Sequence, residues 1–307
     1  MTRAGERLSD VPRAVVHTSF GAVEYADVGE GEPLLVIHGI FGGRDQGLES
    51  FDGLLSDRRV LAPSRFGYLG SSMPHGATPG LQADALVELL DALGIERIDV
   101  IGYSAGSASA LQLALRHPTR VRALIVMCGD WPGPTAAAPP RPLKLAYRSE
   151  AVMWLATTLA GPALLRFVAG VPRDFELSAA DKAKARRMIK IMFPVRERWH
   201  GVIFDAYSGN PDVNVYPLDS IQVPTLVVHA RDDTMASFAS AEAAAQRIPD
   251  SHFVAHPRGG HLMLGQQAST QAWVAEFLRT TAKEGHDLRT QPDPDVSEPL
   301  DGVVTSQ

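Results

Sequence analysis

The chain has 307 residues, of which 45% are hydrophobic and 21% charged, so it is long and apolar enough to bury a large core. A net charge of −6 gives no basic surface for a nucleic acid. Cys128 is the only cysteine, which excludes an internal disulfide. The first twelve residues lack the apolar core of a secretory signal, so we expect a cytoplasmic protein. We find no phosphate loop, zinc-ligand pair or dinucleotide glycine motif in a suitable context, and we expect neither metal nor cofactor.

Strand-like and helix-like runs alternate along most of the chain. The strand-like runs lie near residues 13–19, 22–27, 33–38, 59–62, 98–101, 121–127, 223–229 and 252–255. This alternation predicts an α/β fold with a mostly parallel eight-stranded sheet and helices on both faces. One helix should begin at Thr78-Pro79 and end at Gly94. The last helix should bury Trp273, Val274, Phe277 and Leu278 on one face.

The third strand ends in His38-Gly39, and a glycine-containing loop follows. A reaction that transfers an acyl group develops a negative oxygen, which backbone N–H groups stabilise without reorganising. We expect this loop to supply one such donor, from Ile40, with Phe41 as second choice. His38 itself is expected to brace the loop.

The fifth strand runs into Gly-x-Ser-x-Gly at residues 102–106, and a stretch of small residues with helical character follows. A sharp strand-to-helix turn of this kind lifts a serine hydroxyl above the edge of a sheet. Ser104 is therefore the candidate nucleophile. The N–H of Ala105, at the start of the helix, is the second candidate oxyanion donor.

Residues 130–217 interrupt the alternation. Three helical stretches, near 143–158, 162–169 and 178–207, lie between prolines, and an insertion after the sixth strand should roof the carboxyl ends of the strands as a helical cap. Its apolar side chains should in part line a substrate pocket. The run 151–169 is too short to span a membrane and is broken at Gly161-Pro162.

Acidic residues follow the seventh strand, and a histidine base needs such a carboxylate to fix its tautomer. Spacing alone allows either Asp232 or Asp233. Asp130, just after the sixth strand, is a further alternative. The last histidine, His261, lies in a glycine loop 28 residues after Asp233, and it is the candidate base.

Taken together, these segments resemble the α/β-hydrolase fold family, of the type with a helical cap, over about residues 13–282. The match rests on His38-Gly39, on the elbow at 102–106, on the glycine-serine loop at 65–72, on Ala230-Arg231-Asp232-Asp233 and on Gly260-His261. The last position of the acidic pattern maps to Asp233. The resemblance implies a Ser104, Asp233, His261 triad, with Ala230 departing from the family's more common glycine.

The sequence therefore predicts a core formed by residues 1–129 and 218–282, a cap at 130–217 and a disordered tail at 283–307. We expect a serine hydrolase that cleaves a small or medium, largely apolar ester through an acyl-serine. Lactone opening, C–C hydrolysis, perhydrolysis and a non-catalytic ligand-binding role are the alternatives. We expect a small-molecule ester as partner and no stable membrane association, and the sequence leaves a homodimer open. The side chains predicted to line the substrate pocket are Phe41, Tyr103, Trp131, Met153, Trp154 and Met192.

Overall fold

One eight-stranded sheet organises the chain in a computed structural model, which describes residues 2–49, 57–133, 144 and 147–287. The strands are β1 (Ala14–Thr18), β2 (Gly21–Val28), β3 (Glu32–Ile37), β4 (Arg58–Pro63), β5 (Ile98–Tyr103), β6 (Val121–Met127), β7 (Thr225–Ala230) and β8 (Ser251–His256). They lie in the order β1-β2-β4-β3-β5-β6-β7-β8. Strand β2 pairs antiparallel with β1 and β4, and all other pairs are parallel. The predicted mostly parallel sheet is confirmed.

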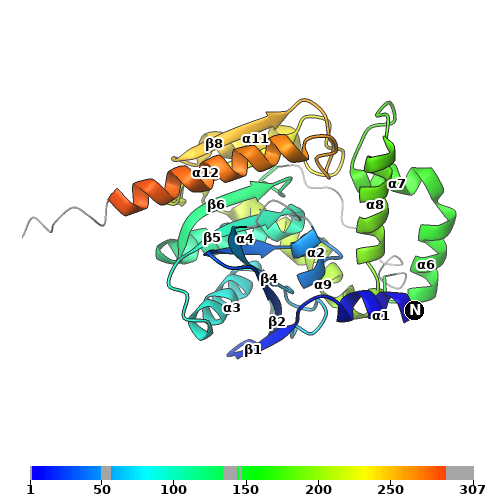
Figure 1. Cartoon of the computed structure of the whole chain (residues 1–307), viewed down its shortest axis with the longest axis horizontal. Helices are drawn as coiled ribbons and strands as arrows, with labels where there is room; N and C mark the ends of the chain where they lie inside the picture. Colours follow the sequence, from blue (N-terminus) through cyan, green and yellow to red (C-terminus); the bar gives the residue numbers. More distant parts are fainter. Residues whose placement is uncertain (1, 50–56, 134–143, 145–146, 288–307) are drawn as a thin grey trace, which may run out of the picture.

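Helices cover both faces of this sheet (Figure 1). The α-helices are α1 (Thr2–Ser9), α2 (Arg44–Glu49), α3 (Pro79–Ala92), α4 (Ser107–Arg116), α6 (Glu150–Leu159), α7 (Gly161–Ala169), α8 (Ala179–Ile191), α9 (Trp199–Phe204), α10 (Asn210–Asp212), α11 (Phe238–Arg247) and α12 (Gln267–Asp287). Short turns are η1 (Ser104–Gly106), η2 (Pro118–Arg120), η3 (Val195–Glu197), η5 (Val213–Val215) and η6 (Leu218–Ser220), and η4 (Asp205–Gly209) is a π-helix. Helices α3, α4 and α11 pack on one face, and α2 and α12 pack on the other.

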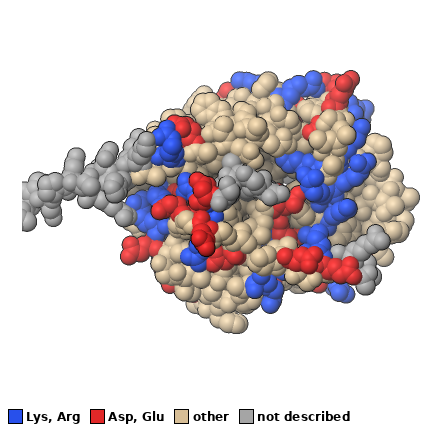
Figure 2. Space-filling model, viewed as in Figure 1, with Lys and Arg blue, Asp and Glu red and all other residues tan. Residues whose placement is uncertain are grey.

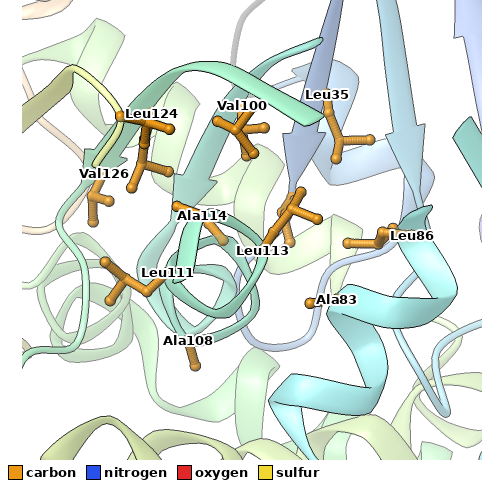
Figure 3. Close-up of a cluster of buried hydrophobic side chains, with 14 of the residues drawn as sticks. Leu35, Ala83, Leu86, Val100, Ala108, Leu111, Leu113, Ala114, Leu124 and Val126 are labelled. Atoms are coloured by element: carbon orange, nitrogen blue, oxygen red, sulfur yellow. The ribbon is translucent and has the colours of Figure 1, made fainter. Parts of the chain in front are cut away.

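The face under α3 and α4 holds the larger hydrophobic cluster (Figure 3). Leu35, Val100 and Leu124 project from three adjacent strands toward Leu86 of α3 and Leu111 of α4, and all five side chains are fully buried. Burying one such leucine stabilises the fold by about 1.5–3 kcal/mol. This packing fixes β5 and α4, and with them the turn that joins the two elements.

The predicted start and end of α3 are confirmed, whereas the predicted end of the last helix is wrong. Helix α3 begins where Thr78 Oγ1 accepts the backbone N–H of Leu81, at 3.1 Å, and it ends just before Gly94, which has a φ of +67°. Helix α12 continues to Asp287, past the boundary expected at 282, and the rest of the predicted tail lies outside the described residues. The expected burial of Val274, Phe277 and Leu278 is confirmed, whereas Trp273 is 52% exposed and its expected burial is wrong.

The segment between β6 and β7 contains helices α6 to α10, which we call the helical insertion (Figure 1). The single helix expected at 178–207 is wrong. Helix α8 ends at Ile191, three residues before Pro194. A proline has no backbone N–H and clashes with the preceding turn, so the helix does not continue through it. Among the described helices none is long and apolar enough by itself to cross a membrane; α6 and α7 meet such a test only as a pair, bent by 102°.

Helix α1 was not predicted, because its sequence is polar and carries no capping signal. It lies against the base of the insertion (Figure 1). Arg7 Nη1 donates to Asp45 Oδ2 at 2.6 Å, and Nη2 donates to the carbonyl of Phe193 at 2.8 Å. Helix α1 is therefore held by tertiary contacts rather than by its own sequence.

Candidate active site

Ser104 lies at the turn between β5 and α4, with a left-handed backbone φ of +51°. Non-glycine residues rarely adopt this conformation unless surrounding packing enforces it. The turn is so tight that a Cβ added to Gly106 would lie 2.4 Å from the carbonyl oxygen of Ile37. One added to Gly102 would lie 2.6 Å from Ala110 Cβ. The two glycines of the motif are therefore required by close packing, and the serine projects above the sheet as the sequence predicts.

The structure brings Ser104, His261 and Asp233 together in one hydrogen-bonded chain. His261 Nδ1 and Asp233 Oδ2 are 2.8 Å apart, and His261 Nε2 and Ser104 Oγ are also 2.8 Å apart. Because an ionised carboxylate only accepts hydrogen bonds, Nδ1 carries the proton and Nε2 accepts the serine hydroxyl. This is the tautomer that a general base requires.

The loop after β7 decides which of the two acids faces His261. Asp233 Oδ1 accepts the backbone N–H groups of Met235, at 2.8 Å, and Ala236, at 3.1 Å, which leaves Oδ2 directed at the histidine. Asp232 instead accepts the N–H of Gly260 at 2.8 Å. Asp233 is thus the acid beside His261, and Asp232 secures the loop that carries this histidine.

Burial and charge set the protonation states of the pair. Burial alone would raise the pKa of Asp233, but His261 and His229 together hold it well below its usual value. Burial lowers the pKa of His261, and the charge and hydrogen bond of Asp233 outweigh this effect, so the pKa is raised. Asp233 is therefore ionised at neutral pH, and it stabilises the imidazolium that forms when His261 accepts a proton.

Asp130, the alternative acid, does not hydrogen-bond His261. Burial raises the pKa of Asp130 to about 6, with Asp205 and Asp233 adding to the effect and His261 opposing it. The charge of Asp130 in turn raises the pKa of His261. Asp130 therefore acts on the histidine through its field.

The His38-Gly39 loop passes directly beside the serine. A Cβ on Gly39 would lie 3.0 Å from Ser104 Cβ. His38 Nδ1 lies 2.7 Å from the carbonyl of Gly39, and Nε2 accepts the N–H of Arg65 at 2.9 Å, so His38 braces the loop as expected. Ile40 and Phe41 follow Gly39 in this loop, and Ile40 stays the predicted oxyanion donor, with Phe41 as second choice.

Buried ion pairs between the insertion and the core hold the two ends of this loop. Arg65 forms a bidentate pair with Asp205 of η4, both bonds at 2.6 Å, and its Nε donates to the carbonyl of His38 at 2.9 Å. At the other end, Arg198 donates to the carbonyl of Gly42 and to Asp45. No local pattern predicts these pairs, since their members are separated by up to 153 positions.

The insertion also contacts the histidine loop. The N–H of His261 donates to the carbonyl of Ala169 at 2.8 Å, at the end of α7. A Cβ on Gly170 would lie 2.4 Å from His261 Cβ, and the φ of Gly170 is +62°. Tyr103 adds a bond from its hydroxyl to the carbonyl of His261, at 2.8 Å. The candidate base is therefore positioned from both the core and the insertion.

The residues predicted to line a substrate pocket lie in several environments. Phe41 is half-buried, with its ring 5.4 Å from that of Tyr147. Trp131 is buried in the cluster that includes Val213. Met153 is a buried residue of α6, and Met192, just after α8, is half-buried.

The structure corrects the expectation for Trp154. Its side chain is 60% exposed and lines an open cleft between α6, α7 and α8, whose lining residues include none of Ser104, Asp233 and His261.

Cys128, Asp233 and His261 place potential metal-ligand atoms within 4.8 Å of one another. Both ring nitrogens of His261 are already engaged in the chain described above. Burial raises the pKa of the Cys128 thiol well above its usual value, which keeps it neutral. The arrangement therefore fits proton transfer better than metal binding.

Comparison with known proteins agrees with the fold. The profile of the alpha/beta hydrolase fold matches residues 32–267. The 2-hydroxymuconate semialdehyde hydrolase of Pseudomonas putida is 30% identical over 85% of this chain and 91% of its own length. A 2-hydroxy-6-oxo-2,4-heptadienoate hydrolase of Pseudomonas putida is 28% identical over 82% and 91%. An alpha/beta hydrolase fold protein from Nakamurella multipartita superposes with a TM-score of 0.70 at 26% identity, covering 87% of this chain and 99% of the other.

The chain therefore belongs to the alpha/beta hydrolase fold family, and it is a hydrolase.

Proposed function

We propose that this protein is a serine hydrolase that cleaves an uncharged, largely apolar carboxylic ester through an acyl-serine intermediate. The observation that carries the proposal is the continuous chain from Ser104 Oγ through His261 to Asp233, with 2.8 Å at each step. Nucleophile, base and orienting acid within hydrogen-bond reach are the requirement for this chemistry.

The proposed reaction has two halves. Ser104 Oγ attacks the ester carbonyl while His261 Nε2 takes the hydroxyl proton, and the N–H groups of Ile40 and Ala105 stabilise the oxyanion. The C–O bond of the ester breaks, and His261 returns the proton to the departing alcohol. Water then attacks the acyl-serine as His261 takes one of the water protons. The bond from the acyl carbon to Ser104 Oγ breaks, His261 returns the proton to Oγ, and the carboxylic acid leaves.

Electrostatics favour an uncharged substrate. The charges of Asp205 and Asp233 both act on Asp130, and the nearby Arg65 is paired with Asp205 and donates to the carbonyl of His38. A substrate carboxylate placed beside Asp130 and Asp233 would meet negative charge, while Arg65 is already paired with Asp205. Burying such an unpaired charge is costly.

A second candidate is hydrolysis of a C–C bond beside a carbonyl group. The names of two relatives that align over most of their length favour it, since neither 2-hydroxymuconate semialdehyde nor 2-hydroxy-6-oxo-2,4-heptadienoate contains an ester. Both compounds carry a carboxylate, which the charges around Asp130 oppose. The ester reaction is therefore the first candidate.

The test compares both reactions in one preparation. We expect turnover of p-nitrophenyl esters, little turnover of 2-hydroxy-6-oxo-2,4-heptadienoate, and rapid covalent labelling of Ser104 by a fluorophosphonate. Ser104→Ala should lose both turnover and labelling while keeping the wild-type circular dichroism spectrum. Faster cleavage of the dienoate than of every ester would select the second candidate, and wild-type activity in Ser104→Ala would overturn both.

A further inference from the structure

The outer surface of the insertion is unusually apolar. Five of the nine large apolar side chains that are exposed in the described chain lie on α6 and α7. They are Val152, Trp154, Leu155, Leu159 and Phe167, exposed by 48% to 75%. The fifteen residues from 151 to 165 contain no charged side chain. A surface of this kind on a water-soluble chain usually marks a contact site.

A basic stripe runs beside this apolar surface. Helix α8 contains five basic residues and one acidic residue. Figure 2 shows Lys and Arg gathered in a band over α8, next to an uncharged surface over α6. Lys184 and Arg187 have partners, on the carbonyl of Leu262 and on Glu49. Lys182, Arg186 and Lys190 have no acidic partner among the described residues.

An open cleft joins the two surfaces. Its volume is ≈ 1220 Å³, and it lies between α6, α7 and α8 with Arg7 of α1 at its base. Leu165, Ile189 and Phe193 form apolar parts of its lining, while Arg186 and Lys190 stand among its lining residues as unpaired cations. The apolar wall of the cleft matches the acyl chains of an anionic lipid, and the cations in its lining match the lipid headgroup.

We propose that α6, α7 and α8 form a docking surface for an anionic lipid bilayer. Tryptophan and leucine on one side of a helical element and Lys or Arg on the other are the features of interfacial, non-spanning membrane contact. Long basic side chains extend toward headgroups while their stems pack on apolar surface. The 102° bend between α6 and α7 presents the apolar residues as a wedge that enters the interface without crossing it.

A second copy of the chain fits the surface less well. In a twofold dimer the same patch meets itself, so Arg186 and Lys190 would approach the same residues of the other copy. Like charges at such an interface oppose association, whereas an anionic bilayer complements them. The inference rests on this surface alone and is independent of the reaction at Ser104.

The test measures partition of the full-length protein onto vesicles of phosphatidylcholine alone and of phosphatidylcholine with 30% phosphatidylglycerol. We expect binding to the anionic vesicles, weakened by added salt, and a blue shift of Trp154 fluorescence that Trp154→Phe abolishes. The double variant R186E/K190E should bind at least about tenfold more weakly, since each basic residue near a surface contributes about fivefold. The double variant L159S/F167S should also bind at least about tenfold more weakly, because it removes apolar side chains that would enter the interface.

Matched controls lie on α12, away from the insertion. Trp273 is exposed there, and Arg279 is exposed and paired with Glu276, so W273S and R279E should bind as the wild type does. Melting temperature checks the folding of each variant. Equal binding to both vesicle types, or no binding by a folded wild-type protein, would overturn the proposal. A dimer in sedimentation velocity that dissociates in L159S/F167S, without vesicle binding, would overturn it in favour of self-association.

Discussion

At the scale of single residues, the two oxygens of Asp233 have separate roles. Oδ1 is held by two backbone N–H groups of its own loop, and Oδ2 faces His261 at 2.8 Å, with His229 Nε2 farther away at 3.4 Å. The carboxylate is thus fixed before a substrate binds, and His261 is held in the tautomer that accepts the Ser104 proton. Asp130 adds negative charge nearby without occupying either ring nitrogen.

The pH dependence of turnover should report this arrangement. Protonated His261 cannot accept the serine proton, and its raised pKa means that activity appears only as pH rises above the range of an ordinary histidine. Asp130→Asn removes a charge that stabilises the imidazolium, so the acidic limb should move to lower pH. The measurement is kcat/KM for a p-nitrophenyl ester between pH 5 and 9.

The exposed Asp219→Asn, which removes one acid remote from the site, is the control and should leave this limb in place. An acidic limb that stays fixed or rises in Asp130→Asn would contradict the electrostatic role of Asp130.

At the scale of elements, the end of α7 packs against the loop that carries the base. Gly170 ends α7 in a left-handed conformation, and a Cβ there would overlap His261 Cβ at 2.4 Å. Gly161, at the start of the same helix, also has a positive φ, of +49°, but a Cβ there would meet nothing within 4 Å. The two positions share backbone strain and differ in contact with the site.

Gly170→Ala should therefore lower kcat much more than Gly161→Ala. Displacing a catalytic group by about 1 Å costs on the order of 10²-fold, so we expect a loss of about 10- to 100-fold in kcat with a smaller change in KM. Both variants should lose about 1 kcal/mol of stability from the left-handed backbone alone. Equal kcat in the two variants would show that α7 does not position His261.

The sequence predicted the elements that depend on local patterns. All eight strands appear at the strand-like runs of the sequence, and the elbow appears where Gly102 and Gly106 permit it. It did not predict α1, whose stability comes from Arg7 contacts, or the bond from His261 to Ala169. These depend on residues far apart in the chain, and periodicity carries no information about such pairs. The exposure of Trp154 was missed for the same reason, since an apolar helix in a sequence does not say which face is covered.

At the scale of the whole molecule, buried charges join the insertion to the core. The Arg65–Asp205 pair and the Arg198–Asp45 pair are both almost fully buried. The first joins η4 to the end of β4, and the second joins the start of α9 to α2. Backbone bonds from Gly201 to Gly67 and from Leu69 to Glu197 lie between them. We infer from these contacts that the insertion folds together with the core, although α6 and α7 at its outer edge carry exposed side chains.

We therefore expect one cooperative unfolding transition, with the same midpoint by circular dichroism and by tryptophan fluorescence. Fluorescence reports on both parts of the chain, because Trp154 and Trp199 lie in the insertion and Trp131 and Trp273 lie outside its helices. Asp205→Asn leaves Arg65 buried without its counter-charge and should lower the free energy of unfolding by about 3–5 kcal/mol. Asp219→Asn, which breaks an exposed pair with Arg247, should leave it nearly unchanged. Urea denaturation of the three proteins makes the measurement. Two separate transitions in the wild type, or equal stability of the two variants, would mean that the insertion folds apart from the sheet and that the clamp on the His38 loop contributes little.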